Sequence, residues 1–153
     1  MKNINISRKT TFAIILVVFF VILDKILKYL ALNGYFDQPF YLIGNIFSLN
    51  FSQNYNIAFS LPVSGPILIG LIIVIIIILL YFLAYLIEKR RENNYLILTF
   101  LIVGALINLI DRLKYGFVVD YFDLKYFTVF NTADIMIVCS ILLMLIINVK
   151  RQK

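Results

Sequence analysis

The chain has 153 residues, of which 63% are hydrophobic and 14% are charged, with a formal net charge of +6. Soluble proteins average about 45–50% apolar and about 25% charged residues, so this composition excludes a disordered chain and a soluble domain of this size. The chain has no histidine and a single cysteine, Cys139, which excludes Ser–His and Cys–His catalysis, an imidazole metal site and an intrachain disulfide.

Apolar stretches predict four membrane-spanning helices, at about residues 11–32, 66–88, 95–113 and 132–149. A helix needs roughly 20 residues to cross a bilayer, so the last two span only if their outer ends carry polar residues into the membrane. The first stretch resembles a signal peptide, but Asp24 and Lys25 occupy the place of a small-residue cleavage site. We therefore expect an uncleaved first helix.

Two segments between these helices, residues 33–65 and 114–131, contain glycine or proline turns and short apolar-aromatic runs. The runs at 40–43, 46–51 and 117–122 are candidate strands. The sequence thus predicts a single membrane domain over residues 1–153, an all-α integral membrane fold with a small sheet at the membrane surface.

The basic residues indicate the orientation of the chain. Nine of the fourteen Lys and Arg lie in three clusters on one side of the predicted helices, at residues 2–9, 89–91 and 150–153. By the positive-inside rule both termini are cytoplasmic, and residues 33–65 and 114–131 are extracytoplasmic. Because topology explains the net charge, nucleic-acid binding is not expected.

Acidic residues of three helices are expected at one depth. At 1.5 Å per residue, Asp24, Asp111 and Asp134 lie about 22 to 24 Å from the basic ends of their helices, within a hydrocarbon core of roughly 30 Å. Charged side chains at such a depth are costly and typically mark a functional site that faces the bundle interior.

Structural roles are an alternative for most of these polar residues. Asp24 and Lys28 are spaced i, i+4 and can neutralise each other, while Arg112 can pair with Asp111 or extend to lipid phosphates. Three asparagines can serve as helix caps or interhelical hydrogen-bond partners: Asn54, Asn108 and Asn131. Asp123 is expected to be a solvated loop charge and Cys139 a packing residue.

Asp120 and Asp134 are the candidate catalytic pair. Asp120 follows an apolar strand candidate, and Asp134 starts the fourth helix. Two close carboxylates cannot both ionise cheaply, so one keeps a proton and can polarise a carbonyl while the other activates water. The helix N-terminus favours a charged Asp134, so we expect Asp120 to hold the shared proton more often.

Five segments resemble those of the lipoprotein signal peptidases, the type II signal peptidases of bacteria. The segments occur in the family's order, and the similarity extends over essentially the whole chain. The segments resemble, in turn, the family patterns D-x-x-x-K at Asp24–Lys28, N-x-G-x-A-F at 54–59, N-x-x-D-R at Asn108–Arg112, G-x-V-V-D-F at Gly116–Tyr121 and F-N-x-A-D at Phe130–Asp134.

The resemblance implies an aspartic endopeptidase of the bacterial cell (inner) membrane. Its substrates would be diacylglyceryl-modified prolipoproteins, cleaved just before the lipidated cysteine by Asp120 and Asp134, without metal or other cofactor. It further implies four transmembrane helices with an extracytoplasmic β-cradle, a monomer among membrane lipids, and inhibition by globomycin-type cyclic peptides. Substrate-binding residues would be Asp24, Lys28, Asn54, Asn108, Asp111, Arg112 and Asn131.

Four positions depart from the family patterns. Asn56 and Ile57 replace a glycine and a small residue, Ile107 replaces a glycine, and Tyr121 replaces the usual Phe. Asn also has access to positive φ, so a turn at Asn56 is expected to survive. Ile107 is expected to alter helix packing, since small residues let helices approach closely.

Two other classes of function fit a four-helix membrane protein. A small ion- or proton-coupled transporter would use the carboxylates as an ion path, but nothing ionisable continues inward from them. A non-catalytic membrane scaffold would tolerate neutral replacement of the Asp residues.

Overall fold

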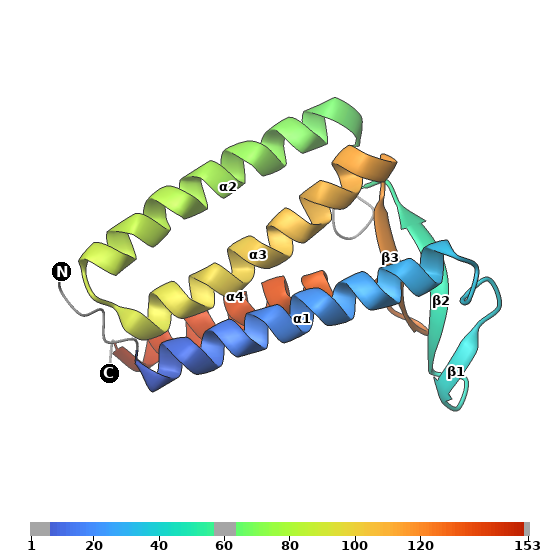
Figure 1. The fold of residues 1–153 in the computed structure, drawn as a ribbon, viewed down its shortest axis with the longest axis horizontal. Coiled ribbons are helices and arrows are strands. Elements are labelled where there is room, and N and C mark those ends of the chain that lie inside the picture. Colours follow the sequence, from blue (N-terminus) through green and yellow to red (C-terminus); the bar gives the residue numbers. More distant parts are fainter. Residues whose placement is uncertain (1–6, 57–63, 152–153) are drawn as a thin grey trace.

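The computed structural model describes residues 7–56 and 64–151, which form four long helices and a small antiparallel sheet (Figure 1). The helices are α1 (Arg8–Leu32), α2 (Gly65–Glu88), α3 (Glu92–Tyr115) and α4 (Thr132–Arg151). The strands are β1 (Phe40–Ile43), β2 (Phe47–Asn54), β3 (Val118–Leu124) and β4 (Val129–Phe130). All four helices are long and apolar enough to cross a membrane, which confirms the predicted fold class.

Some predictions concern residues outside these ranges. They include Ile57, Phe59 at the end of the second family segment, and the terminal basic residues Lys2 and Lys153.

Capping residues mark the start of α1 and the end of α3. The Ser7 side chain accepts a hydrogen bond from the backbone N–H of Thr10 (3.1 Å), so α1 starts at Arg8 rather than at residue 11. Helix α3 starts at Glu92, which accepts hydrogen bonds from the hydroxyls of Ser7 and Thr10. Helix α3 ends at Tyr115 and is followed by Gly116, whose φ of 81° lies in the left-handed region that glycine adopts without steric cost.

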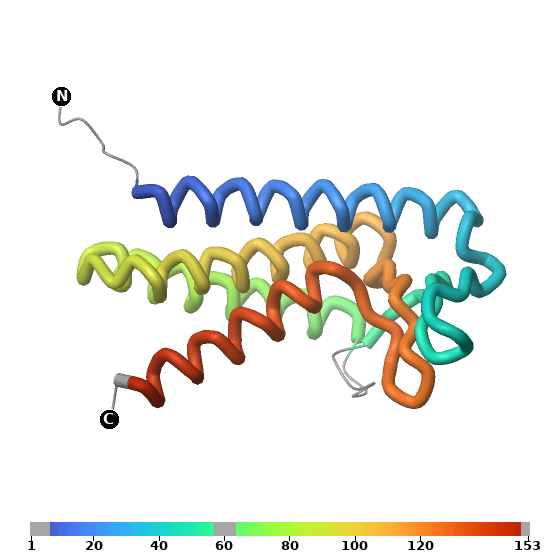
Figure 2. The backbone as a smooth tube through the Cα atoms, turned by 90° about the horizontal axis from the view of Figure 1, so that it is seen from below, coloured from blue at the N-terminus to red at the C-terminus, as the bar shows by residue number. Residues whose placement is uncertain are grey.

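Helix α3 is the centre of the bundle, between α2 and α4 (Figures 1 and 2). Leu86 of α2 packs against Leu98 and Ile102 of α3 in one apolar cluster. The outward faces of the helices carry large exposed apolar side chains, such as Ile67 (78% exposed) and Tyr81 (80%) on α2. A bilayer is the solvent that such a surface requires.

A glycine permits the close approach of α3 and α4. A Cβ atom built at Gly104 would lie 2.7 Å from the carbonyl oxygen of Ala133 and 3.0 Å from a side-chain carbon of Ile137. Gly104 lies one helical turn before Asn108, so it brings α4 close to α3 beside that asparagine. Gly104, rather than position 107, is therefore the small residue at the contact between α3 and α4. Ile107 is only partly buried.

The strands form one sheet in the order β1-β2-β3-β4, all antiparallel, at one end of the bundle (Figure 1). The register shifts between Leu49 and Ser52 of β2, where β2 has one more residue than β3. Since side chains alternate along a strand, this bulge moves Asn54 to the face of β3 that carries Asp120. The predicted bounds of β1 agree with the structure and those of β2 and β3 lie within three residues, whereas the two-residue β4 was not predicted.

The opposite face of β3 packs against the C-terminal end of α1. Val119 and Tyr121, both fully buried, form a core with Ala31 and Phe36. The first turn of α1 and the α2–α3 turn lie at the far end of the bundle from the sheet (Figure 1).

Gly104→Ala is expected to lower the free energy of unfolding by about 1–3 kcal/mol, because the added methyl group meets backbone that must shift. Thermal unfolding in detergent micelles measures the change. Gly70→Ala is the matched control, since a Cβ atom at Gly70 of α2 has no atom within 4 Å. Equal stability of both variants would contradict tight packing of α3 against α4.

Candidate active site

Asp134 lies in the first turn of α4 and forms a reciprocal cap with Asn131. The Asp134 backbone N–H donates to Oδ1 of Asn131 (2.9 Å), and the Asn131 backbone N–H donates to Oδ2 of Asp134 (3.1 Å). This is the capping-box arrangement, in which two otherwise unpaired N–H groups of a helix start are satisfied. The carboxylate of Asp134 is thereby held at the helix N-terminus, where a negative charge is favoured.

Asp120 lies on β3 and is almost completely buried, with 1% of its surface exposed. Its Oδ1 accepts a hydrogen bond from Nδ2 of Asn131 (2.6 Å), and its Oδ2 accepts one from Nδ2 of Asn54 (2.9 Å). The Asn54 contact depends on the bulge in β2, which turns this side chain towards Asp120.

Asn131 joins the two carboxylates. Its backbone N–H binds Asp134 and its side-chain amide binds Asp120, although the two residues belong to different elements. Asn108 of α3 completes the link, because its Nδ2 donates to Oδ1 of Asp134 (2.8 Å) and its Oδ1 accepts from Nδ2 of Asn131 (3.1 Å). Within the described ranges, Asp120 and Asp134 share no direct hydrogen bond.

The environment of Asp120 favours its protonated form. Burial raises the pKa of Asp120 to about 7, and the nearby charge of Asp134 acts in the same direction. The hydrogen bonds from Asn54 and Asn131, and the charge of Lys28, oppose this rise in pKa. Asp134 is only partly buried, so the two carboxylates differ in their access to solvent.

A second charged cluster lies on the α1 side of the site. Nζ of Lys28 is 2.8 Å from a carboxylate oxygen of Asp24 and 2.8 Å from one of Asp111. All three side chains are buried, and Oδ2 of Asp111 also accepts the backbone N–H of Val119 (3.2 Å). The predicted ion pair between Asp24 and Lys28 is present, and the ammonium group of Lys28 also forms an ion pair with Asp111.

Arg112 forms no ion pair with Asp111 among the described residues, which corrects one of the roles expected for it. Its guanidinium donates to the carbonyl oxygen of Asn56 (2.9 Å) and makes a longer contact with that of Asn108 (3.4 Å). The turn at Asn56 does not use positive φ, which is a correction to the expectation for this position. Instead, the Asn56 N–H donates to Oδ1 of Asn54 (3.1 Å), because an Asn side chain can bond its own backbone two residues on.

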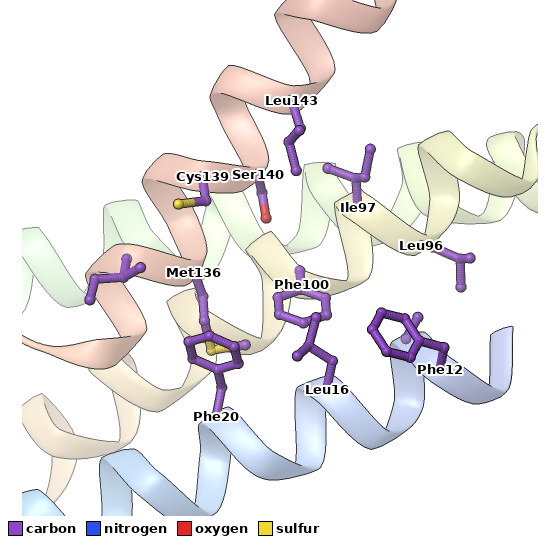
Figure 3. A pocket seen from close by; sticks show the side chains of 12 residues that line it. Phe12, Leu16, Phe20, Leu96, Ile97, Phe100, Met136, Cys139, Ser140 and Leu143 are labelled. Carbon is purple, nitrogen blue, oxygen red and sulfur yellow. The ribbon is translucent and has the colours of Figure 1, made fainter. Parts of the chain in front are cut away.

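A cavity of about 280 Å³ lies between α1, α3 and α4 (Figure 3). Its lining is almost entirely apolar and includes Phe20, Phe100 and Met136, with Cys139 at its edge. None of the polar residues described above lines it. Within residues 7–56 and 64–151, no group of three or more His, Cys, Asp or Glu is placed to hold a metal ion.

The site contains two residues that sequence reasoning did not single out for a role. The hydroxyl of Tyr121 binds Asp24 and Thr132, and all three are buried. Tyr121 was noted only as a departure from the family pattern. Tyr121 follows Asp120 and Thr132 follows Asn131, so both lie next to candidate site residues in the sequence. Nothing in the sequence indicates, however, that Tyr121 and Thr132 contact each other.

The chain is similar to known peptidases over nearly its full length. The family described as Signal peptidase (SPase) II matches residues 16–150. The lipoprotein signal peptidase of Caldicellulosiruptor bescii is 39% identical over 134 residues, covering 84% of this chain and 85% of the relative. That of Clostridium novyi is 30% identical over 148 residues, covering 92% and 99%.

Solved structures show the same fold. A bacterial membrane enzyme determined by the in meso method at 2.3 Å resolution superposes with a TM-score of 0.79 at 28% identity, covering 94% of this chain and 90% of that one. A second bacterial membrane enzyme, at 1.9 Å resolution, gives a TM-score of 0.74 at 29% identity, covering 92% and 94%.

Lys28→Met is expected to lower the free energy of unfolding by about 3–5 kcal/mol, because it leaves two buried carboxylates without their cation. Unfolding in detergent micelles measures the loss. Lys25→Met removes the same charge from an exposed position of the same helix and should change stability little. If the two variants were equally stable, the shared ion pair would not contribute to folding.

Proposed function

The chain belongs to the signal peptidase II family, and we propose that it cleaves its substrates by an aspartic mechanism in which Asp120 and Asp134 share one proton. Family membership makes it a peptidase that removes signal peptides from prolipoproteins. Its four apolar helices make it a multi-pass protein of the bacterial membrane. The identity of the catalytic residues and their mechanism are what we propose.

The contact of Asn131 with both carboxylates is the observation that carries this mechanism. Asp120 of a surface strand and Asp134 of a transmembrane helix both bind Asn131 at the sheet end of the bundle, Asp120 through the side-chain amide and Asp134 through the backbone N–H. Such an arrangement keeps the two carboxylates close while their mutual repulsion and their burial keep one of them protonated. The pKa of Asp120, raised to about 7, supports Asp120 as the protonated partner.

The reaction begins with Asp134 ionised and Asp120 protonated. Asp134 takes a proton from water as the water oxygen bonds to the scissile carbonyl carbon, and Asp120 gives its proton to the carbonyl oxygen. In the resulting diol the carbon–nitrogen bond breaks. The leaving nitrogen takes the proton from Asp134, and one diol hydroxyl returns a proton to Asp120, which restores the starting state.

The remaining polar residues divide into two groups. Asn54, Asn108 and Asn131 donate to the carboxylates and orient them. Arg112, whose guanidinium already binds a backbone carbonyl, is placed to fix the peptide backbone of the substrate. Asp24, Lys28 and Asp111 are engaged with one another and buried, so we assign them to support of the site rather than direct substrate contact.

The substrate enters from the bilayer, with its acyl chains in lipid and its scissile bond, just before the diacylglyceryl-modified cysteine, at the carboxylates. The described basic residues away from the sheet, such as Arg8, Lys9 and Lys89, belong to the clusters that the positive-inside rule assigns to the cytoplasm. We therefore propose that the sheet lies outside the cytoplasm and that both termini lie inside it. Globomycin-type cyclic peptides would compete for the same site, and one monomer supplies all of its residues.

Asp120→Asn and Asp134→Asn are each expected to abolish cleavage of a diacylglyceryl-modified prolipoprotein, because an amide can neither accept nor return the shared proton. The measurement is the initial rate per mole of folded protein in detergent micelles. Asp123→Asn is the matched control on the same strand, since Asp123 binds only Asn50 among the described side chains and should leave the rate unchanged. Cleavage at the normal rate by both catalytic variants would refute the mechanism.

The cleavage rate is expected to fall as pH rises through about 7, because Asp120 must be protonated to act and its pKa is raised to about 7. Well above that value, each further pH unit lowers the rate about tenfold. Initial rates measured between pH 5 and pH 9, with folding monitored by circular dichroism at each pH, provide the test. A rate that stays level or increases between pH 7 and pH 9 would be incompatible with an acid role for Asp120.

A further inference from the structure

Tyr121 lies next to Asp120 on β3 but faces the opposite side of the strand. It is fully buried against α1, and its hydroxyl is the meeting point of three elements. The hydroxyl is 2.9 Å from Oδ1 of Asp24 on α1 and 2.5 Å from Oγ1 of Thr132. It also accepts the backbone N–H of Thr132 (3.0 Å), the first residue of α4.

The chemistry of the groups fixes the direction of each hydrogen bond. Asp24 is paired with Lys28 and is therefore an ionised acceptor, so the single hydroxyl proton of Tyr121 goes to Asp24. The hydroxyl of Thr132 must then donate to the Tyr121 oxygen, together with the Thr132 N–H. The Tyr121 oxygen thus makes one donated and two accepted bonds, which is its full capacity.

This hydroxyl caps the start of the helix that carries Asp134. The N–H of the first helical residue has no intrahelical acceptor, and Tyr121 provides one across the fold. The reciprocal cap of Asn131 and Asp134 satisfies two further groups of the same turn. The N-terminus of α4 is therefore held at two points, through Asn131 and through Tyr121.

The two points connect the same pair of segments. Asn131 binds Asp120 itself, whereas Tyr121, one residue further along β3, binds Thr132, two residues before Asp134. A change in the Tyr121–Thr132 contact would therefore move the backbone of Asp120 relative to that of Asp134. The Tyr121–Thr132 contact therefore adds a second constraint between β3 and the start of α4, beside the one through Asn131.

We propose that Tyr121, acting with Thr132, is a positioning residue that sets the separation of Asp120 and Asp134. The inference deepens the proposed function, because it rests on these two carboxylates as the catalytic pair. Tyr121 touches neither carboxylate and acts only through β3 and the first turn of α4. Burial raises the pKa of the Tyr121 hydroxyl, so this contact stays neutral and intact across the pH range in which the carboxylates titrate.

The first test compares Tyr121→Phe, which removes one oxygen atom, with Tyr41→Phe at an exposed tyrosine of β1 (61% exposed). Tyr121→Phe should lower kcat roughly 10- to 100-fold with KM within about twofold, because the substrate contacts remain while the geometry of the pair loosens. It should also move the alkaline midpoint of the pH–rate profile to lower pH. A wider separation weakens the charge of Asp134 that helps to raise the pKa of Asp120.

The second test separates positioning from stability. Tyr121→Phe leaves the Thr132 hydroxyl buried without its partner, and adding Thr132→Val removes that group, so the double variant should regain part of the lost stability. If Tyr121 positions the pair, kcat stays low in the double variant although stability recovers. Recovery of kcat in step with stability, or unchanged kcat and pH midpoint in Tyr121→Phe, would overturn the proposal.

Asp120→Asn is assayed in parallel. If it is inactive while Tyr121→Phe behaves as wild type, only the positioning role fails. If Asp120→Asn cleaves normally, the aspartic mechanism itself fails, and the positioning role with it.

Discussion

The structure depends on placing two carboxylates beside each other at the boundary between a helix bundle and a sheet. Asn131 meets this constraint with a single side chain and its own backbone N–H, and in doing so it also defines where α4 begins. The same hydrogen bonds that cap the helix therefore assemble the site. A buried carboxyl is stable only if it is hydrogen-bonded or neutral, and Asp120 combines amide donors with a pKa raised towards neutrality.

The surrounding fold keeps these groups in place by satisfying other charges away from the carboxylate pair. Lys28 neutralises Asp24 and shares its charge with Asp111, which in turn accepts a backbone N–H from β3. Close packing of α3 against α4 at Gly104 brings Asn108 within reach of Asp134. Strand β3 is thus fixed to α1 on one face and to the helix ends on the other, so the sheet becomes a rigid part of the site.

The distribution of charge along the helices distinguishes a peptidase from a transporter. Ionisable side chains occur near the two ends of the bundle, and the middle of each helix is apolar. The cavity between α1, α3 and α4 is apolar as well, so it provides no path for ions or protons. The proposed chemistry uses the carboxylates at the sheet end of the bundle, of which Asp134 is the more exposed and Asp120 the more buried.

The sequence by itself determined the four spans and the common depth of the carboxylates, because bilayer thickness and helical rise convert residue number directly into position. It also indicated three of the four strands, from short apolar-aromatic runs between turn residues. The reciprocal cap between Asn131 and Asp134 could also be predicted from the sequence, since the two residues have the i, i+3 spacing of a capping box. Tertiary structure decided the partners across elements. Asn54 meets Asp120 only because of a bulge in β2, Lys28 is shared by two helices, and Tyr121 joins Asp24 to Thr132. The alternation of side chains along a strand defines which residues share a face. The strand register and the packing of the helices determine which residues that face contacts.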